Sequence, residues 1–548
     1  MKKIQTVLVS VTDKTHLSFF LKGLLAINPS INLIASGGTA EELKKFEIPF
    51  TLLSDYTKSP ECFGGRVKTL HPKIMGGILY RRGVHEEEAK KLGIEGIDLV
   101  ICNLYDFEKA ALNPENRLED VVEKIDIGGS TLLRSACKNF SDVAVVVDPG
   151  DYESLLKELV SLEGSLSLET RKSLAVKAIQ LSAAYESVLA SELSKRMKSE
   201  KMHFIQLNKG QELRYGENPD QKGWIYEFAN AGGLAQAKIL SGKQISFNNY
   251  EDATLAYYSS QELISLGSNY GVSIVKHGSL CGYATGQNEL QALERAWECD
   301  SKSAFGSVIG LSFECSSQLI PFLTKKFIEV IVAPKFESAF IQWAEKVKPN
   351  LRLLELGKKR EDLFIFKSIS GGMLVQTRKQ NPTRSLAELF MPSLSSETSP
   401  RGIMTKKAPL PEQLNLFGFA ILAVNFLKSN AIAIVREYAP GSYQMIGSGS
   451  GQPNRIDCLE RLALPKTIDN LRAENLNVAS YDPKKDLSTC VLASDGFFPF
   501  ADSINSAASQ GIKYCIQPGG SNNDLSVIQA ADAQEMCMIF TGQRYFYH

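Results

Sequence analysis

Short apolar runs rich in β-branched residues, separated by helix-like segments, constrain the fold of this chain more than any other feature. The N-terminal part holds four such runs, at Thr6–Val11, Ile31–Ala35, Leu99–Leu104 and Val143–Val147. Runs of this length are typical of buried strands, and the helical spacing of segments such as His16–Ala26 indicates that helices connect them. Strands that alternate with short helices predict an α/β domain with a parallel sheet.

Polar or glycine-rich segments follow three of these predicted strands. They are Ser10–Lys14, Ser36–Thr39 and Asn103–Phe107. In parallel α/β sheets, ligands bind at the carboxyl ends of the strands. The sequence therefore predicts a ligand site at these strand ends.

Length and charge narrow the class of protein. The 548 residues carry 61 Lys plus Arg and 61 Asp plus Glu, so the formal net charge is 61 − 61 = 0. A chain of this length predicts about two to four domains. The zero balance disfavours nonspecific binding to nucleic acid or to an acidic membrane surface, but it leaves room for a small anionic ligand held by local cations.

Neither a membrane segment nor a disulfide framework is indicated. The N-terminal apolar run is too short for a signal peptide, and no stretch approaches the ~18–20 apolar residues of a membrane helix. The ten cysteines are scattered and form no Cys-x-x-Cys pair. We therefore expect a cytoplasmic protein with reduced thiols, without a zinc site or another metal centre of side-chain ligands.

The pattern changes near Met202–Gly210, after a long predicted helix at Leu168–Lys198. We predict one domain over residues 1–200 and a larger α/β region over residues 201–548. The polar stretch Gln376–Lys407 is predicted to connect two lobes of that region. Glycine-rich loops are expected in it at 276–286, 303–310, 447–452 and 517–521.

Three motifs of the first domain carry chemistry, and each has a plainer interpretation. The segment GGRVKTLHPK at 64–73 suits an oxyanion, because glycines expose backbone N–H groups and Arg can fork onto phosphate, but it also fits a solvated basic turn. The segment Ser36–Thr39 fits a phosphate cradle at a helix N-terminus or an ordinary capped turn. Asp126 is either a helix cap or a carboxylate that faces a substrate.

The second region has three comparable motifs. Lys276 and His277 end an apolar strand beside glycine, where a histidine is positioned for proton transfer or is simply structural. Asn430 orients a polar substrate or caps an element. The cluster of aromatics and carboxylates at 494–500 suits a flat heteroaromatic ligand or forms core. The Walker A motif and the zinc-deaminase signature are both absent from the sequence.

Taken in order, motifs from both halves resemble one family. They include SVTDKT, ASGGTA, GGRVKTLHP, CNLYDF, DIGGSTLLRSACKN, LRYGENPDQ, GKQISFNNYEDA, VKHGSLCG, SAFGSVIG, KSNAIAI, GSGSGQPNR, SDGFFPFAD and TGQRYFYH. On these motifs the chain resembles, nearly end to end, the bifunctional AICAR transformylase/IMP cyclohydrolase family of purine biosynthesis. The resemblance implies a methylglyoxal-synthase-like, parallel-sheet domain followed by a transformylase region of two cytidine-deaminase-like α/β lobes without zinc.

The resemblance also implies two consecutive reactions. A formyl group passes from 10-formyltetrahydrofolate to the 5-amino group of AICAR, which gives FAICAR and tetrahydrofolate. FAICAR then closes to IMP with loss of water. The resemblance also implies a homodimer with transformylase sites built across the subunit boundary. It implies a structural potassium ion as well, although no sequence motif indicates one.

In the cyclohydrolase half, the resemblance implies four catalytic residues. Lys68 is expected to stabilise the developing oxyanion, Asp126 and Lys138 to orient or deprotonate the attacking amide, and Tyr105 to assist proton movement. The nucleotide contacts implied in this half are Ser10, Lys14, Ser36, Gly37, Gly38, Thr39, Arg66, Thr69, Cys102, Asn103, Ile127 and Gly128, together with Lys68 and Asp126.

In the transformylase half, His277 matches the proton acceptor, Lys276 the group that stabilises developing charge, and Asn430 a substrate-orienting position. The implied AICAR-binding residues are Arg214, Tyr215, Gly306, Glu329 and Arg455. The implied folate-side residues are Phe497, Asp502, Ser521, Asn522 and Arg544.

The chain departs from the family pattern at several positions. His16 stands where glycine is usual, Asp106 replaces proline after the tyrosine, and Ser279 and Leu280 replace asparagine and proline after VKHG. These changes leave the transformylase loop geometry open. A monofunctional cyclohydrolase is therefore the nearest alternative, and a regulatory protein that binds nucleotide without turnover, or a methylglyoxal-synthase-like activity, is a more distant one.

Overall fold

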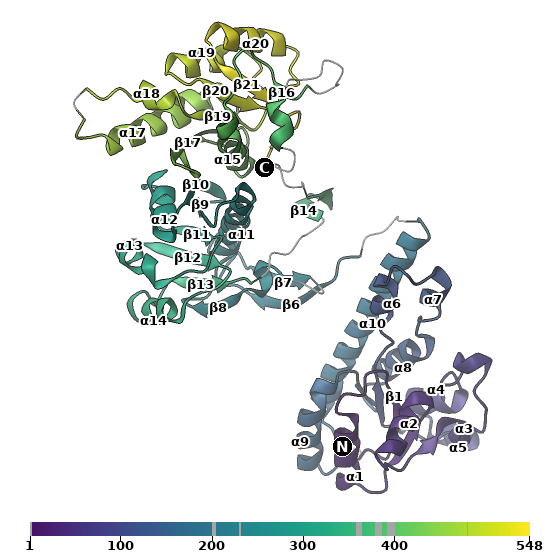
Figure 1. Cartoon of the computed structure of the whole chain (residues 1–548). Helices are drawn as coiled ribbons and strands as arrows, with labels where there is room; N and C mark the ends of the chain where they lie inside the picture. The colour runs from purple at the N-terminus through teal and green to yellow at the C-terminus, as the bar shows by residue number, and fades with distance from the viewer. Residues whose placement is uncertain are drawn as a thin grey trace. The chain divides into compact units, whose positions relative to one another are not determined.

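The structure is a computed structural model (Figure 1), and it describes residues 3–199, 204–228, 232–357, 364–378, 386–391, 400–478 and 480–548. The chain divides into two compact units, Met1–Gln206 and Leu207–His548. The predicted boundary between residues 200 and 201 lies outside the described residues, as does much of the predicted connection at 376–407. Both therefore stay predictions.

The first unit is built on a five-stranded sheet in the order β3-β2-β1-β4-β5, and every neighbouring pair in it is parallel. Its strands are β1 (Thr6–Ser10), β2 (Asn32–Ala35), β3 (Thr51–Leu52), β4 (Leu99–Cys102) and β5 (Ala144–Val146). The predicted parallel α/β fold is thus confirmed. The two-residue strand β3 was not expected, because it carries no apolar run of its own.

Helices cover both faces of this sheet. The longer ones are α1 (Leu17–Ile27), α2 (Gly37–Lys45), α4 (Pro72–Leu79), α8 (Ile127–Lys138), α9 (Tyr152–Ser161) and α10 (Leu168–Arg196). Along β1, Val7 and Val9 pack in the same core cluster as Phe20 of α1, while Leu8 packs with Leu132 of α8 on the opposite face. This alternation gives three layers with the sheet in the middle.

The second unit contains a twelve-stranded sheet made of two lobes with the same strand plan. In the first lobe, the hairpin β9–β10 is followed by the parallel strands β11, β12 and β13, with β8 antiparallel at the edge. In the second lobe, the hairpin β17–β18 is followed by β19, β20 and β21, with β16 antiparallel at the edge. The two hairpins meet where β10 pairs with β18. Figure 1 shows the first lobe in teal and the second in green to yellow.

The bounds of the first-lobe elements are β8 (Lys238–Ser241), α11 (Phe247–Glu262), β9 (Tyr270–Lys276), β10 (Ser279–Gly286), α12 (Glu289–Glu298), β11 (Ser307–Leu311), β12 (Ile328–Ala333), α14 (Ser338–Val347) and β13 (Arg352–Glu355). Those of the second lobe are β16 (Gly402–Ile403), α15 (Leu414–Asn425), β17 (Ile432–Ala439), β18 (Ser442–Gly449), α17 (Leu464–Glu474), β19 (Val491–Ser494), α19 (Asp502–Ser509), β20 (Tyr514–Gln517), α20 (Asp524–Ala533) and β21 (Cys537–Phe540). Two further hairpins pair β6 (Leu207–Glu212) with β7 (Trp224–Phe228), and β14 (Phe364–Ile369) with β15 (Gly372–Thr377).

Four stretches that were expected to be loops or a connection are strands. Residues 279–286 form β10, residues 307–311 lie in β11, residues 447–449 end β18, and residues 402–403 pair with β21 as β16. The glycines misled the prediction, because they serve close packing rather than turns. A Cβ on Gly282 would stand 2.2 Å from the carbonyl oxygen of Ala296, and one on Gly310 would stand 2.1 Å from that of Ala256. Glycine in these strands lets a helix lie directly against the sheet.

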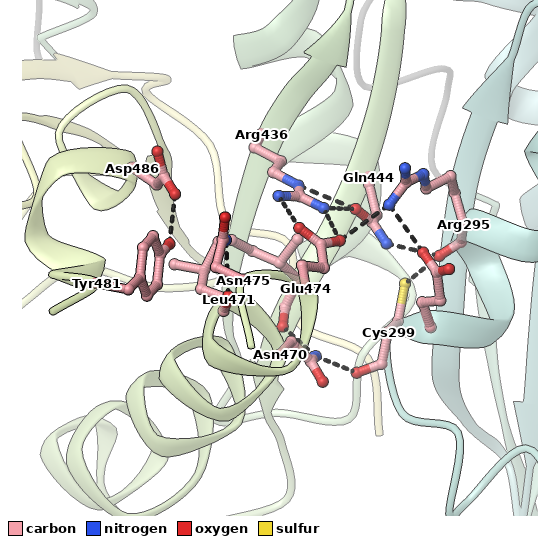
Figure 2. A network of polar contacts seen from close by, with 12 residues as sticks. Arg295, Cys299, Arg436, Gln444, Asn470, Leu471, Glu474, Asn475, Tyr481 and Asp486 are labelled. Atoms are coloured by element: carbon pink, nitrogen blue, oxygen red, sulfur yellow. Dashed lines mark hydrogen bonds and ion pairs between the residues drawn. The ribbon is translucent and has the colours of Figure 1, made fainter. Parts of the chain in front are cut away.

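A polar network joins the two lobes beside the central hairpins (Figure 2). Arg436 of β17 and Arg295 of α12 both pair with the carboxylate of Glu474 in α17, and Arg295 Nη1 lies 2.9 Å from Glu474 Oε1. Gln444 Nε2 donates to the carbonyl oxygen of Arg295 at 2.8 Å, and Asn470 Nδ2 donates to that of Cys299 at the same distance. These contacts hold the lobes in one register.

No helix among the described residues is both long enough and apolar enough to span a bilayer. The cysteines, all within the described ranges, are free thiols.

Candidate functional site

The sheet of the first unit places its predicted site residues at one edge. The strand order reverses between β1 and β4, and such a switch point opens a crevice at the carboxyl ends of the strands. Ser10 and Cys102 end these two strands and are paired in register, and Ser36 follows the end of β2. The three predicted segments therefore meet at the same edge of the sheet.

Two of the predicted binding residues hold the loop after β1. Asn103 Oδ1 accepts hydrogen bonds from the backbone N–H groups of Thr12 and Asp13 at 2.6 and 3.0 Å, and its Nδ2 donates to the carbonyl oxygen of Asp13 at 2.9 Å. The buried Thr39 hydroxyl accepts from Val11 N at 3.1 Å and lies 3.2 Å from Val11 O. Both side chains shape the crevice through backbone contacts.

Two ammonium groups converge on the glycines that open α2. The Nζ of Lys68 lies 3.5 Å from the point where a Cβ would stand on Gly37, and the Nζ of Lys14 lies 3.6 Å from the corresponding point on Gly38. Gly37 has a φ of +49°, a conformation that suits glycine. The first N–H groups of a helix attract anions, and two lysines beside them add positive charge.

Asp126 both caps α8 and faces this positive charge. Its Oδ1 accepts the N–H of Gly129 at 2.7 Å, so the predicted helix cap is present. Burial raises the pKa of the Asp126 carboxyl, although hydrogen bonds from the backbone N–H groups of Gly129 and Tyr105 and the nearby charge of Lys68 act in the opposite direction. A carboxylate that holds its proton more tightly than usual is a stronger base, as proton abstraction requires.

Thr69 lies against the start of the same helix. A Cβ on Gly128 would stand only 2.5 Å from Thr69 Oγ1, so glycine at this position lets the threonine approach. The Tyr105 side chain is exposed, and its backbone N–H faces the Asp126 carboxylate. Cys102 is buried, and its environment raises the thiol pKa first through burial and then through the charge of Asp126.

Two other predicted residues stand apart from this cluster. The exposed Arg66 forms an ion pair with Glu123, and its Nε lies 3.3 Å from Glu123 Oε2. Lys138 is the last residue of α8, whereas Asp126 precedes the first. At about 1.5 Å of rise per residue, the two Cα atoms are about 18 Å apart, so one chain does not bring these side chains together.

Two departures from the family pattern have local structural explanations. His16 precedes α1 with a φ of +56°, which explains why glycine suits this position. Asp106 precedes α6 (Phe107–Leu112), and its Oδ1 accepts the N–H of Lys109 at 3.0 Å. A proline at this position would fix φ, whereas the aspartate caps α6 beside Tyr105.

In the second unit, His277 lies at the tip of the β9–β10 hairpin. His277 and Gly278 form the two-residue turn, with φ of +54° and +67°, and Lys276 pairs with Ser279 across it. Positive φ at both central residues is the signature of a type I′ turn. The exposed imidazole is thus presented by a tight turn in a backbone conformation that few residues other than glycine adopt.

A carboxylate on α11 accepts hydrogen bonds from the backbone of this turn. The oxygens of Asp252 accept the N–H groups of His277 at 3.1 Å and Gly278 at 2.6 Å. Burial raises the pKa of Asp252, while these hydrogen bonds and the charges of His277 and Lys428 lower it. The Nζ of Lys428 also donates to the carbonyl oxygen of His277 at 3.4 Å. Sequence reasoning missed Asp252 because nothing in its helical context distinguishes it from a surface carboxylate.

Lys276 points toward a second loop of the first lobe. Its Nζ donates to the carbonyl oxygen of Phe305 at 2.6 Å. The same Nζ lies 4.0 Å from the point where a Cβ would stand on Gly306. Gly306 has a φ of +71°. Asn430, from the second lobe, donates through Nδ2 to the carbonyl oxygens of Gln452 and Pro453, both at 2.9 Å.

The substituted residues of the loop have defined places. Ser279 begins β10, and its hydroxyl lies 3.3 Å from that of Ser450 in the other lobe. Leu280 is buried in the core cluster of the unit. The two departures therefore belong to the lobe junction and the core, and Lys276 and His277 keep their hairpin positions.

The remaining predicted AICAR residues fall in two groups. Glu329 of β12 accepts from Asn249 Nδ2 at 3.0 Å and lies 3.7 Å from Arg352 Nη1. The pKa of Arg352 is lowered first by burial, and the nearby charge of Arg214 acts in the same direction. The Arg214 guanidinium lies 5.4 Å from the ring centroid of Tyr215. Arg214, Tyr215 and Glu329 thus gather around Arg352, which sequence reasoning missed.

The second group surrounds Arg455 in the second lobe. Its Nη2 lies 3.1 Å from the fully buried Asp495, and its Nε donates to Ser494 Oγ at 3.2 Å. A Cβ on Gly496 would stand 2.0 Å from the same guanidinium. The guanidiniums of Arg455 and Arg544 lie 5.7 and 5.0 Å from the ring centroid of Phe546.

The predicted folate residues all lie in this second lobe. Phe497 follows Gly496 in the loop after β19, Asp502 begins α19, and Ser521 and Asn522 lie between β20 and α20. Ser521 Oγ accepts the N–H of Asn523 at 3.1 Å. Phe546 connects this group to Arg455, and sequence reasoning missed it because a C-terminal aromatic has no motif context.

Two family models match this chain. Residues 17–131 match the model of the MGS-like domain, and residues 136–466 match that of the AICARFT/IMPCHase bienzyme. A solved structure titled "Crystal structure of ForH" is 34% identical over 35% of this chain and 98% of that chain, with a TM-score of 0.32. Because the second match alone spans more than half of the sequence, the chain belongs to the AICARFT/IMPCHase bienzyme family, which transfers a formyl group to AICAR and closes the product to IMP in the last two steps of IMP synthesis.

Proposed function

We propose that the Met1–Gln206 unit carries the cyclohydrolase activity and the Leu207–His548 unit carries the formyl transfer. The observation that supports this division most is the meeting of Lys14, Lys68 and Asp126 at the switch point of the parallel sheet. A phosphate at the N-terminus of α2, between the two ammonium groups, would leave the imidazole part of FAICAR near the Asp126 carboxylate.

The ring closure needs orientation, a base and a charge partner. The carboxamide nitrogen of FAICAR attacks the formyl carbon, the formyl oxygen gains negative charge, and the nitrogen loses a proton. Lys68 stabilises that oxygen, and the buried Asp126 accepts the proton. Tyr105, whose backbone N–H faces the same carboxylate, assists proton movement as the water leaves.

The formyl transfer needs a base beside a weakly nucleophilic amine. The exposed imidazole of His277 takes the proton from the 5-amino group as it attacks the formyl carbon of 10-formyltetrahydrofolate. The bond between that carbon and N10 then breaks, and N10 takes up a proton as tetrahydrofolate leaves. Lys276 stabilises the developing charge, and Asn430 orients the carboxamide. AICAR binds between the group around Arg214 and Glu329 and the group around Arg455.

The folate is expected in the second lobe. Its contacts are the residues that the loops after β19 and β20 and the C-terminal segment supply, namely Phe497, Asp502, Ser521, Asn522 and Arg544. Phe546, with two guanidiniums near its ring, offers a face on which a flat pterin can stack.

Further features complete the proposal. We expect a cytoplasmic homodimer, and a structural potassium ion held by carbonyl oxygens. Within the described parts of the chain, no three or more His, Cys, Asp or Glu side chains group as a metal site. Thermal unfolding in potassium chloride against sodium chloride at equal ionic strength tests the ion, because a bound potassium stabilises only the first sample.

A coupled assay with the purified full chain tests the whole function. AICAR with 10-formyltetrahydrofolate should yield IMP, and FAICAR supplied separately should also yield IMP. Accumulation of FAICAR would overturn the cyclohydrolase assignment. Closure of added FAICAR without formylation of AICAR would overturn the transformylase assignment and favour the monofunctional alternative.

A further inference from the structure

The ammonium group of Lys276 is held by a loop of the first lobe, and that loop is itself held from the second lobe. Lys276 Nζ donates to the carbonyl oxygen of Phe305 at 2.6 Å. A lysine ammonium has three N–H groups, so this contact fixes its position and leaves two donors for a substrate. Phe305 lies in the segment between α12 and β11, residues 299–306, which we call the 299–306 loop. The place of the ammonium therefore depends on the conformation of this loop.

The end of the 299–306 loop near Phe305 is fixed within the first lobe. The N–H of Gly306 donates to the carbonyl oxygen of Phe327 at 2.8 Å. The hydroxyl of Ser307, which begins β11, donates to the carbonyl oxygen of Ala304 at 2.7 Å. These contacts tie the last residues of the loop to the sheet, and they leave its beginning to be fixed by other groups.

The beginning of the loop is organised by Asp300, whose carboxylate pairs with a lysine of the second lobe. Asp300 Oδ1 accepts the N–H of Ser303 at 3.1 Å, and its Oδ2 accepts from Lys466 Nζ at 2.7 Å. The Asp300 side chain is only 14% exposed, so its charge needs a partner. Burial acts to raise the pKa of this carboxyl, but the hydrogen bond and charge of Lys466, with the contact from Ser303, outweigh it and lower the pKa.

Lys466 belongs to a row of α17 residues that faces the first lobe. Lys466, Asn470 and Glu474 are four residues apart and therefore lie on one face of the helix. Asn470 Nδ2 donates to the carbonyl oxygen of Cys299 at 2.8 Å, and Glu474 Oε1 lies 2.9 Å from Arg295 Nη1 (Figure 2). The row thus extends the polar network of the lobe junction to the first residues of the 299–306 loop.

We propose that Lys466 is a positioning residue for the formyl transfer. It fixes the 299–306 loop through Asp300, and this loop fixes the Lys276 ammonium through the carbonyl oxygen of Phe305. A residue of the second lobe thereby sets the position of a charged group that the first lobe contributes to the reaction. The effect on the rate rests on the proposed function of Lys276, whereas the effect on the loop rests on the contacts alone.

Steady-state kinetics of the full chain test this role. Lys466→Met should lower kcat for FAICAR formation by about tenfold and change KM for AICAR and for the folate by less than about twofold, because a displaced ammonium loses charge stabilisation that is needed mainly in the transition state. Lys466→Arg, which keeps a cation near Asp300, should restore most of the rate. Closure of added FAICAR by the same preparations should stay at the wild-type level. A wild-type kcat for Lys466→Met would overturn the proposal.

A double-mutant cycle shows whether Lys466 acts through Lys276. Lys276→Met should lower formyl transfer by about 10²–10³-fold, because charge stabilisation is lost. Lys466→Met in that background should cost less than about a further twofold, since the group that it positions is already gone. A further tenfold loss would overturn the proposal, because Lys466 would then act by another route. Full formyl transfer by Lys276→Met would overturn the proposed role of Lys276 and the positioning role with it.

Amide hydrogen exchange tests the loop independently of activity. Exchange of the peptide that covers the 299–306 loop should become faster in Lys466→Met, because the loop loses its tie to α17. The matched control is Lys238→Met, which removes another ion pair of the same unit, at 3.0 Å from a Glu355 side chain that is 19% exposed. Its exchange in this peptide and its kcat should equal those of the wild type. Unchanged exchange in Lys466→Met overturns the proposal.

A second variant of the same helix face separates position from stability. Glu474→Ala removes the partner of Arg295 and leaves the contact between Lys466 and Asp300 in place. It should lower the urea midpoint of unfolding without the tenfold loss of kcat that Lys466→Met shows. An equal loss of kcat in both variants would mean that the whole lobe junction, and not Lys466, sets the rate, which overturns the proposal.

Discussion

The carboxylate of Asp252 accepts the backbone N–H groups of His277 and its neighbour Gly278, so a buried acid on α11 fixes the turn that carries the proposed proton acceptor. The contact joins a helix to a hairpin tip through backbone atoms only. It leaves His277 exposed to solvent. The position of the turn and the chemistry of the side chain can therefore be altered separately.

Replacing His277 by asparagine should separate these two roles. Asparagine favours the positive φ of a type I′ turn, so His277→Asn should fold with unchanged or greater stability. Formyl transfer should fall by about 10²–10⁴-fold, because the base is lost. Thermal unfolding and the rate of FAICAR formation measure the two effects. Full formyl transfer by His277→Asn, or by His277→Ala, would reject the proton acceptor.

Removing the Asp252 carboxylate should lower stability more and formyl transfer less than replacing His277 does. Asp252→Ala leaves two backbone N–H groups without their acceptor, at a cost of about 1–3 kcal/mol in unfolding free energy. Formyl transfer should fall by about tenfold as the turn loosens, whereas Asp252→Asn, which keeps one acceptor oxygen, should lose less. Urea titration and the transformylase rate check this order. Equal losses for both variants would contradict it.

The charge of the buried Asp126 carboxylate should lower the unfolding free energy at neutral pH, although the proposed reaction needs this carboxylate. Because burial raises its pKa in the folded state above the ordinary 3.8, this carboxyl contributes stability below the unfolded pKa, and that contribution is lost as pH rises through the folded pKa. Asp126→Asn keeps a good helix cap and removes the buried charge. At pH 7 its unfolding free energy should equal or exceed that of the wild type, and the difference should shrink in acid.

The same carboxyl should shape the pH profile of ring closure. If the ionised form of Asp126 is the base, the rate falls in acid with a midpoint above 3.8. Asp126→Asn should lose about 10²–10⁴-fold in rate and lose this limb. The dependence of FAICAR closure on pH measures both. If the rate of Asp126→Asn still falls in acid, another group is responsible for that fall.

Gly128 should be essential for the position of Thr69. A Cβ at Gly128 would stand 2.5 Å from Thr69 Oγ1, which forces the threonine or the start of α8 to move. Gly128→Ala should therefore lower cyclohydrolase activity by about 10²-fold and leave formyl transfer unchanged, since a displacement of about 1 Å has such effects. Gly38→Ala, whose Cβ meets only ordinary contact with Lys14 at 3.6 Å, is the control, and it should retain more activity.

The network of Figure 2 should contribute to the stability of the second unit. Arg436 and Arg295 share the carboxylate of Glu474, and the Arg436 side chain is only 13% exposed. Glu474→Ala leaves these positive groups without their partner, and we expect a loss of about 2 kcal/mol, since Glu474 itself is partly open to solvent. Glu474→Gln keeps a hydrogen-bond acceptor and should lose less. An unchanged urea midpoint for Glu474→Ala would show that solvent replaces the pair.

The amino-acid order alone determined the class of the fold and the sets of candidate residues. The runs at Thr6–Val11 and Leu99–Leu104 predicted parallel strands, because burying both sides of a strand requires continuous apolar residues. Local signals of this kind act over a few residues. They failed for Gly282 and Gly310, whose role depends on a helix packed against the strand.

Only the tertiary structure decided which of the candidates meet. Lys68 and Asp126 are far apart in sequence and share one crevice, whereas Asp126 and Lys138 stand on one helix and are held at its opposite ends. Asp252 and Phe546 became candidates only through their contacts. The physical reason is that sequence patterns report burial and local conformation, whereas hydrogen bonds and electrostatic interactions act through space and depend on distances that the packing of distant elements sets.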